Sequence, residues 1–169
     1  MRNPNQRRWH PARVFSALVL FAFLTVLVSQ PTRAEGWSGI EPLKSRRIDV
    51  ERLLGKPLNE PQGDESTLHF KVAGGSVTVS FVDARFVTNK KLRPELEGTV
   101  LQIILQHERS SDTPESLSLD KKREFDRQDE RDITVYRNLK GGVTYTFIDS
   151  RLKTTRYSAS ADQLVRARK

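Results

Sequence analysis

The chain has 169 residues, enough for one domain with an apolar core, and it contains no cysteine. The absence of cysteine excludes disulfides, thiol catalysis, cysteine-ligated zinc and a lipid anchor on an N-terminal cysteine. The net charge of +8 is unevenly placed, because residues 1–34 hold five arginines and no acid, and without them the net charge is +3. The remaining charges are an ordinary mixture, so we expect no nucleic-acid partner.

Residues 1–34 have the three parts of a secretory signal peptide. A polar, basic start precedes an apolar run over residues 14–28, and Thr32 and Ala34 supply the small side chains of a cleavage site. We expect a cut after Ala34 that leaves residues 35–169 as one domain in the periplasm or the medium. The alternative is a retained anchor that contacts the membrane, although the run is shorter than the roughly 20 residues of a spanning helix.

Trp37 and a short helical pattern lie near the start of the predicted mature chain. Ile40 lies close behind Trp37, which favours an anchor of the N-terminal segment against the core over a binding role. Ser45 is expected to cap a helix over residues 46–54, and Gly55 to end it in a left-handed conformation. The apolar face of this helix consists of Val50, Leu53 and Leu54.

A β-hairpin is predicted next. Residues 67–72 and 77–82 alternate apolar and polar side chains on either side of Gly74-Gly75. We expect the two glycines to form the turn. The expected register sets three apolar pairs on one face, namely Val72 with Val77, Phe70 with Val79, and Leu68 with Phe81.

The middle of the chain is predicted less completely. Asp83-Ala84 is expected to be a turn and residues 88–98 a polar loop. Residues 99–107 carry apolar side chains at both odd and even positions, which indicates a strand at the centre of a sheet. Residues 113–131 combine a helix-start signal, strand-like alternation and dense charge, so we assign them no state.

A second set of strands follows. Residues 132–137 and 143–148 alternate in period two around a longer turn, and residues 151–158 form a third strand. Ser160 is expected to cap a C-terminal helix.

Two stretches of the sequence are alike. Gly74 to Phe86, with Ser76 omitted, aligns with Gly141 to Leu152, and Gly-Gly, Val-Thr, Phe, Asp and Arg are identical. We therefore expect an internal repeat of residues 66–88 and 132–154. The predicted fold is α+β, with two layers, in which an antiparallel sheet built from two similar hairpin units packs against short helices.

The polar residues give no catalytic constellation. His69 and His107 are each expected on a strand, where they face solvent or a neighbouring hydroxyl; a metal or acid–base role would need further ligands, and Glu108 is the only local candidate. Asp83 and Asp149 recur in the repeat as turn residues. No phosphate loop, dinucleotide fingerprint or nucleophile motif occurs. We assign no catalytic, cofactor-binding or metal-binding residue and no cofactor.

The C-terminal end is basic. A weak role at anionic lipid or polyanions is one interpretation, and a solvated strand with a polar tail is the other. The residues concerned are Arg151, Lys153, Arg156, Arg166, Arg168 and Lys169.

Residues 39–43 and the run from Ser45 to Pro57 resemble a group of uncharacterised secreted bacterial proteins. The helix that ends in Leu53-Leu54-Gly55, followed by a hairpin and by Phe-x-Asp, also resembles SmpA/BamE-like outer-membrane assembly lipoproteins and the tandem-repeat fold of β-lactamase inhibitory proteins. These resemblances imply a non-enzymatic α+β fold that works by protein contact. The chain departs from the lipoprotein pattern, because no cysteine follows the signal peptide.

These observations predict an exported, non-catalytic protein of the cell envelope that acts as a protein–protein interaction module. Its partner would be another envelope or secreted protein. The alternative is a small ligand-binding domain or a hydrolase that uses a pocket on a sheet face, with His69 or His107 as its polar group.

Overall fold

A computed structural model describes residues 36–58 and 66–168. The signal-peptide prediction for residues 1–34 therefore concerns residues outside the described ranges. Residues 59–65, in the loop after α1, and Lys169 also lie outside them. The described elements, in chain order, are α1 (Arg47–Leu54), β1 (Thr67–Val72), β2 (Gly75–Phe81), α2 (Ala84–Lys90), η1 (Pro94–Leu96), β3 (Val100–His107), η2 (Leu119–Lys121), β4 (Asp126–Glu130), β5 (Ile133–Asn138), β6 (Val143–Ile148), β7 (Arg151–Ser158) and α3 (Ala161–Arg166).

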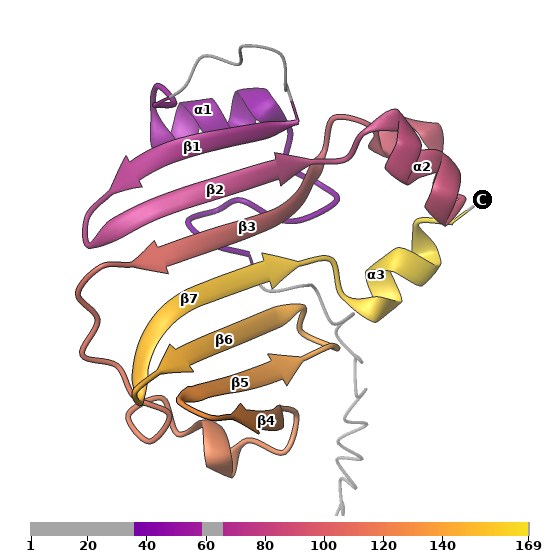
Figure 1. Ribbon diagram of the computed structural model, residues 1–169. Helices are drawn as coiled ribbons and strands as arrows, with labels where there is room; N and C mark the ends of the chain where they lie inside the picture. The colour runs from indigo at the N-terminus through magenta and orange to yellow at the C-terminus, as the bar shows by residue number, and fades with distance from the viewer. Residues whose placement is uncertain (1–35, 59–65, 169) are drawn as a thin grey trace, which may run out of the picture. The chain divides into compact units, whose positions relative to one another are not determined.

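The strands form one seven-stranded sheet in the order β1-β2-β3-β7-β6-β5-β4 (Figure 1). Every pair of neighbouring strands is antiparallel. All neighbours are consecutive in the chain except β3 and β7, which join the first three strands to the last four. The described part of the chain is thus an α+β fold with short helices, and within it no helix has both the length and the apolar character needed to cross a membrane.

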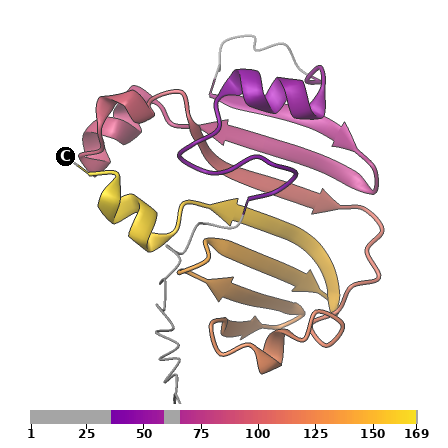
Figure 2. The same cartoon turned by 180° about the vertical axis from the view of Figure 1, so that it is seen from behind.

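The apolar core under β1–β3 lies on one face of the sheet. Phe70, Val77 and Ile103 are fully or almost fully buried there, and Ile40 and Val50 cover them from the N-terminal segment and α1. Figures 1 and 2 show α1 and the segment before it on this side of the strands. Burial of such side chains contributes about 1.5–3 kcal/mol each, which explains how an eight-residue helix is held without strong propensity.

Two smaller apolar clusters complete the core. Tyr136 and Phe147 pack with Leu119, which lies in the segment before β4. Tyr136 and Phe147 meet edge to face, with ring centroids 5.8 Å apart and planes at 84°. A third cluster contains Leu92, Leu96 and Ala167, so it ties the segment after α2 to the end of α3.

The first hairpin forms, but its predicted register is wrong by two residues. Val72 pairs with Gly75 instead of Val77, so the turn consists of Ala73 and Gly74. Gly74 has φ +83°, the conformation that glycine adopts at least cost. Because the shift is even, the predicted apolar face is preserved.

Gly75 has a different role from the one predicted. It belongs to β2 and is opposite His107 on β3. A methyl group at Gly75 would overlap the carbonyl oxygen of Gln106. Close approach of the neighbouring strand, rather than the turn, therefore requires this glycine.

The central position of β3 is confirmed, because β2 and β7 flank it. The alternation of side chains between the two faces is interrupted at one point of β3. Phe81 pairs with Val100, and Ser80 pairs with Gln102, so Leu101 is an extra residue in a bulge. The bulge turns Val100 towards the same core cluster as Ile103, whereas strict alternation along the strand would place Val100 on the other face.

Asp83 begins a helix and not a simple turn. Its carboxylate accepts a hydrogen bond of 2.6 Å from the amide of Phe86, which makes it the N-cap of α2. The following residues form α2 and η1 where a polar loop was expected. In contrast, Asp149 and Ser150 form the predicted tight turn between β6 and β7, with φ values of 49° and 58°.

The two predicted helix caps have different outcomes. Ser160 caps α3 as expected, since its hydroxyl accepts from the amide of Gln163 at 3.1 Å. Ser45 does not cap α1; its hydroxyl accepts from the amide of Glu41, and Arg46 is the N-cap residue. The carboxylate of Asp49 accepts from the amide of Arg46 at 3.0 Å and so satisfies the start of the helix.

The far end of α1 agrees with the sequence in part. Gly55 ends the helix as predicted and has a positive φ of +83°, but its ψ of −156° differs from the left-handed helical conformation that was expected. Val50 is buried and Leu54 packs against the core, but Leu53 is 46% exposed and does not belong to the buried face.

The unassigned segment 113–131 contains turns, η2 and β4. All five residues of β4 are exposed, and its sequence DRQDE has no apolar side chain. It forms the outer edge of the sheet and pairs only with β5. Charged side chains on an edge strand oppose pairing with other chains.

Candidate functional site

The two faces of the sheet differ in what covers them. Along a strand, successive side chains point to opposite faces, so the registers assign each residue to one face. One face holds the apolar core. We call the other the open face, because none of its side chains belongs to an apolar cluster of the described residues, and α1 lies on the opposite side in Figures 1 and 2.

The open face is rich in hydroxyl and amide groups. Across β1, β2, β3, β7, β6 and β5 its residues are Thr67, His69, Lys71, Ser76, Thr78, Ser80, Gln102, Ile104, Gln106, Arg151, Thr154, Arg156, Ser158, Thr144, Thr146, Ile148, Ile133, Val135 and Arg137. All of them are partly or fully exposed. None is acidic, but β4 adds Asp126 and Glu130 to this face, and Glu108, directly after β3, pairs with Lys71 at its edge.

One row of cross-strand neighbours crosses the middle of the open face. From β5 to β1 it reads Arg137, Thr144, Arg156, Ile104, Thr78 and His69. Arg137 and Arg156 are exposed, and within the described residues neither makes a side-chain hydrogen bond or ion pair. Lys71 differs from them, because it pairs with Glu108.

His69 lies at the end of this row. Its Nδ1 atom is 3.0 Å from the hydroxyl oxygen of Thr78, the cross-strand neighbour on β2. This contact is the neighbouring-hydroxyl environment expected from the sequence. It satisfies one ring nitrogen, and no carboxylate of the described residues is hydrogen-bonded to the ring.

His107 lies on the opposite face from His69, so the structure does not bring the two histidines together. Its Nε2 atom is 2.9 Å from the hydroxyl oxygen of Thr155. Burial lowers the pKa of His107 below its usual value, and the charge of Asp112 partly opposes this effect. Glu108, the predicted acidic neighbour, pairs with Lys71, whose hydrogen bond lowers the pKa of the Glu108 carboxyl.

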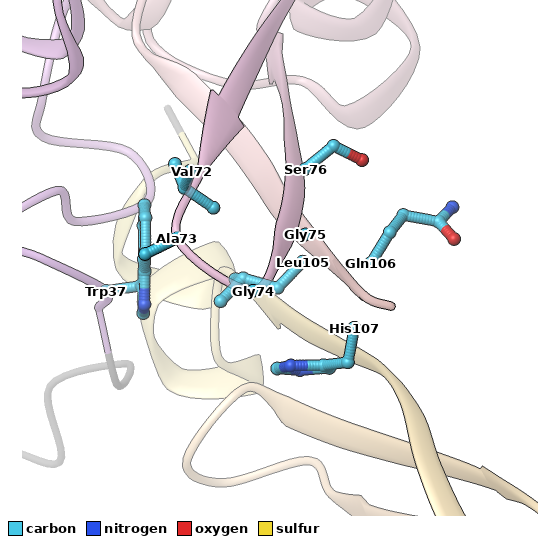
Figure 3. Close-up of a pocket in the computed structure, with 9 residues that line it drawn as sticks. All are labelled: Trp37, Val72, Ala73, Gly74, Gly75, Ser76, Leu105, Gln106 and His107. Carbon is cyan, nitrogen blue, oxygen red and sulfur yellow. The ribbon is translucent and has the colours of Figure 1, made fainter. Parts of the chain in front are cut away.

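His107 lines a small cavity of about 250 Å³ at the β1–β2 turn (Figure 3). Trp37 forms one side, and the turn residues Ala73 and Gly74, with Gly75 at the start of β2, lie between Trp37 and His107. Trp37 also packs against the core under β1–β3, and its backbone pairs with that of Ile40. It is therefore the expected anchor and, in addition, part of a cavity wall.

The remaining polar candidates do not converge on a site. Asp83 and Asp149 act as a helix cap and a turn residue. Across residues 36–58 and 66–168, no group of three or more His, Asp and Glu side chains is placed to hold a metal ion.

The basic C-terminal residues are distributed over different parts of the fold. Arg151 begins β7 and donates to the carbonyl oxygen of Ser111 at 3.1 Å. Arg156 lies on the open face, while Arg166 and Arg168 lie in and after α3, beyond the other end of β7. An eight-residue strand is about 27 Å long, so Arg151 and Arg166 do not share one patch.

A polar cluster beside β4 was not foreseen from the sequence. The hydroxyl of Tyr136 donates to the carboxylate of Asp120 at 2.7 Å, and Arg127 donates to the same carboxylate at 3.1 Å. The guanidinium of Arg127 lies 5.6 Å from the ring centroid of Tyr136. In the sequence, this cluster appears only as a tyrosine in a segment rich in charged residues. No fixed spacing relates Tyr136 to Asp120 and Arg127, so the sequence pattern does not predict their contact.

These features define an α+β protein with a seven-stranded antiparallel sheet, one covered face and one open face. No model of a known protein family matches the chain, and no characterised protein matches it in sequence. A similar solved structure is that of a DUF4309 family protein (YjgB) from Bacillus subtilis, with 17% identity, a TM-score of 0.48, and coverage of 72% of this chain and 83% of that chain. The resemblance to SmpA/BamE-like proteins stays a prediction.

Proposed function

We propose that the protein is an exported, non-catalytic interaction module of the cell envelope, and that it binds a protein partner through the open face. One observation carries the proposal. Six adjacent strands present their side chains on a face that no apolar cluster of the described residues covers. Six strands span roughly 24 Å, which is the scale of a protein interface.

The composition of the open face supports a protein partner. Ile104, Val135 and Ile148 supply partly exposed apolar contacts, and arginine is enriched at protein interfaces. The surrounding hydroxyl and amide groups can donate or accept hydrogen bonds from a partner. The backbone of the strands is already hydrogen-bonded in the sheet, so binding orders little additional chain.

The test is site-specific photo-crosslinking in cells with the full chain. A crosslinking residue placed at Thr144 or Gln106 reports on the open face, and one placed at Arg52, on α1, is the matched control. We expect one protein adduct, identified by mass spectrometry, from the first two positions only. Adducts of equal yield from all three positions, or none from the open face, would contradict the proposal, and cell fractionation of the same strain tests export.

Two similar units would account for the arrangement of this face. We infer that β1–β3 and β5–β7 are copies of one three-stranded unit. In each unit, the pairing of the second strand with the third contains a bulge. The register shifts between Ser80 and Phe81 in the first unit and between Thr146 and Phe147 in the second. These positions are aligned in the sequence repeat. Exchange of residues 77–81 for 143–147 should retain a folded protein if the units are equivalent, whereas failure to fold would oppose the inference.

A second candidate function is small-molecule binding at the cavity between Trp37 and His107. Its volume of about 250 Å³ is slightly below the range of typical ligand pockets, so it fits only a small molecule. A Trp9→Phe variant leaves Trp37 as the only fluorophore of its kind for a ligand screen. Binding that is lost in His107→Gln but kept in His69→Gln would favour this function, and an unchanged Trp37 signal across the screen would oppose it.

A further inference from the structure

We propose that the partner of the open face is an acidic protein surface, and that Arg137 and Arg156 are its principal docking residues. This inference rests on the proposed function and names the chemistry of the partner. The two residues are both cross-strand neighbours of Thr144, from opposite sides. Their Cα atoms are therefore about 10 Å apart on one face, because neighbouring residues across two antiparallel pairs are about 4.5 and 5.5 Å apart.

The cost of burial indicates the partner's charge. Neither guanidinium has an ion pair among the described residues, so a partner that covered this row with neutral or basic groups would bury two unpaired charges. Such burial is strongly unfavourable, because the lost hydration of each ion is not replaced. Carboxylates remove this cost, since a guanidinium can hold a carboxylate through two parallel hydrogen bonds. The hydroxyl of Thr144, between the arginines, can donate a further bond.

The distribution of charge favours a protein over a phosphate surface. Lys71 is already paired with Glu108, and Arg151, opposite Ile148 at the start of β7, donates to the carbonyl oxygen of Ser111. Arg137 and Arg156 make no side-chain hydrogen bond or ion pair within the described residues, and together they form a small target. Asp126 is the cross-strand neighbour of Arg137 on β4, and Glu130 lies on the same strand. A membrane or a nucleic acid presents phosphates continuously and would meet these acids, whereas a protein can place two or three carboxylates over the arginines alone.

The experiment compares charge variants in the full chain. Arg137→Gln and Arg156→Gln remove the charge, Arg137→Lys and Arg156→Lys keep it without the planar fork, and Arg166→Gln on α3 is the control. The yield of the Thr144 adduct is measured for each, together with thermal unfolding. We expect a loss of about tenfold or more for each glutamine variant, a smaller loss for each lysine variant and no change for Arg166→Gln. An exposed arginine contributes little to folding, so the unfolding temperature should not move.

A second arm distinguishes the sources of anionic charge. The purified chain is titrated with a decaglutamate peptide, and separately with vesicles that contain anionic phospholipid, and the amides of β5–β7 are followed by NMR. We expect shifts at Thr144 with the peptide that disappear in the Arg137→Gln, Arg156→Gln double variant. Vesicle binding with the same arginine dependence and no peptide binding would overturn the proposal in favour of a membrane.

The two proposals fail in different ways. A Thr144 adduct that survives all arginine variants would overturn the acidic-partner inference and leave the open face as the interface. The absence of any adduct at the open face would overturn the proposed function itself.

Discussion

The hydroxyl of Tyr136 donates a hydrogen bond of 2.7 Å to the carboxylate of Asp120, which lies 16 residues earlier in the chain. The bond joins β5 to the segment that covers the second apolar cluster. Tyr136→Phe should lower the free energy of unfolding by about 1.5–3 kcal/mol, because one hydrogen bond to a charged acceptor is lost while the ring stays packed. Urea denaturation measures this change.

The control for that variant is the double-mutant cycle with Asp120→Ala. If the two groups act through their hydrogen bond, the double variant should lose less stability than the sum of the two single losses. Strict additivity would show that the bond contributes nothing to stability.

Alkaline pH should weaken the fold through the same tyrosine. Burial, and then the hydrogen bond to Asp120, raises the pKa of Tyr136 from 10 to about 12. The unfolded chain therefore releases this proton at a lower pH than the folded chain does. The contribution is complete below pH 10 and decreases as the pH rises towards 12. Denaturation at pH 9, 10 and 11 should show a steeper decline for the wild type than for Tyr136→Phe, and parallel curves would contradict the assignment.

His107 should titrate below the usual histidine range. Burial lowers its pKa, and Asp112 partly restores it, so Asp112→Asn should move the midpoint lower still. A depressed histidine pKa stabilises the folded state above about pH 6.5, and that contribution is lost as the pH falls. NMR of the imidazole protons measures the midpoint. Asp162→Asn, on α3, is the control, and an unchanged midpoint in Asp112→Asn would contradict the role of that charge.

Two adjacent glycines should differ in their response to alanine. Gly75→Ala places a methyl group onto the carbonyl oxygen of Gln106 on β3, so the strands must separate. We expect a loss of about 3 kcal/mol or more, or failure to fold. The methyl group added by Gly74→Ala would have no neighbouring atom within 4 Å. Its only cost to stability is the strain of an alanine at a φ of +83°, about 1–2 kcal/mol. Thermal unfolding of both variants tests the order, and a larger loss at Gly74 would reverse our assignment of the two roles.

The two aspartates of the sequence repeat should also differ. Asp83→Ala removes the acceptor for the amide of Phe86 and should cost about 1 kcal/mol. Asp149→Gly should be close to neutral, because glycine adopts the φ of 49° found there without a steric cost. Chemical denaturation compares the pair; equal losses would indicate that both residues are simple turn residues.

The sequence predicted the strands whose apolar residues alternate, because alternation follows directly from burying one face of a sheet. It did not predict β4, whose five exposed residues at the sheet edge carry no such signal. It also missed the bulge at Leu101, because an extra residue in one strand is specified by its pairing partner and not by local composition. The helix after Asp83 was missed since the same residue type starts both turns and helices.

The candidate site was less predictable than the fold. Arg137 and Arg156 are 19 positions apart and become neighbours of Thr144 only through the pairing of β5, β6 and β7. Arg137 received no role in the sequence analysis, and Arg156 appeared there only as part of a basic end. The histidines were singled out by their chemistry, but the register places them on opposite faces.

The single non-consecutive pairing, between β3 and β7, has a consequence for how the chain reaches its native state. Strands β1–β3 can assemble from local contacts, and so can β4–β7, because each pairing within these groups joins neighbours in sequence. The β3–β7 seam forms only after the segment from β3 to β7 has closed as a loop, which makes it the step with the largest entropic barrier. During synthesis, which proceeds from the N-terminus, strands β1–β3 would therefore be complete before β7 is made. Until β7 pairs with it, β3 would be an exposed edge strand.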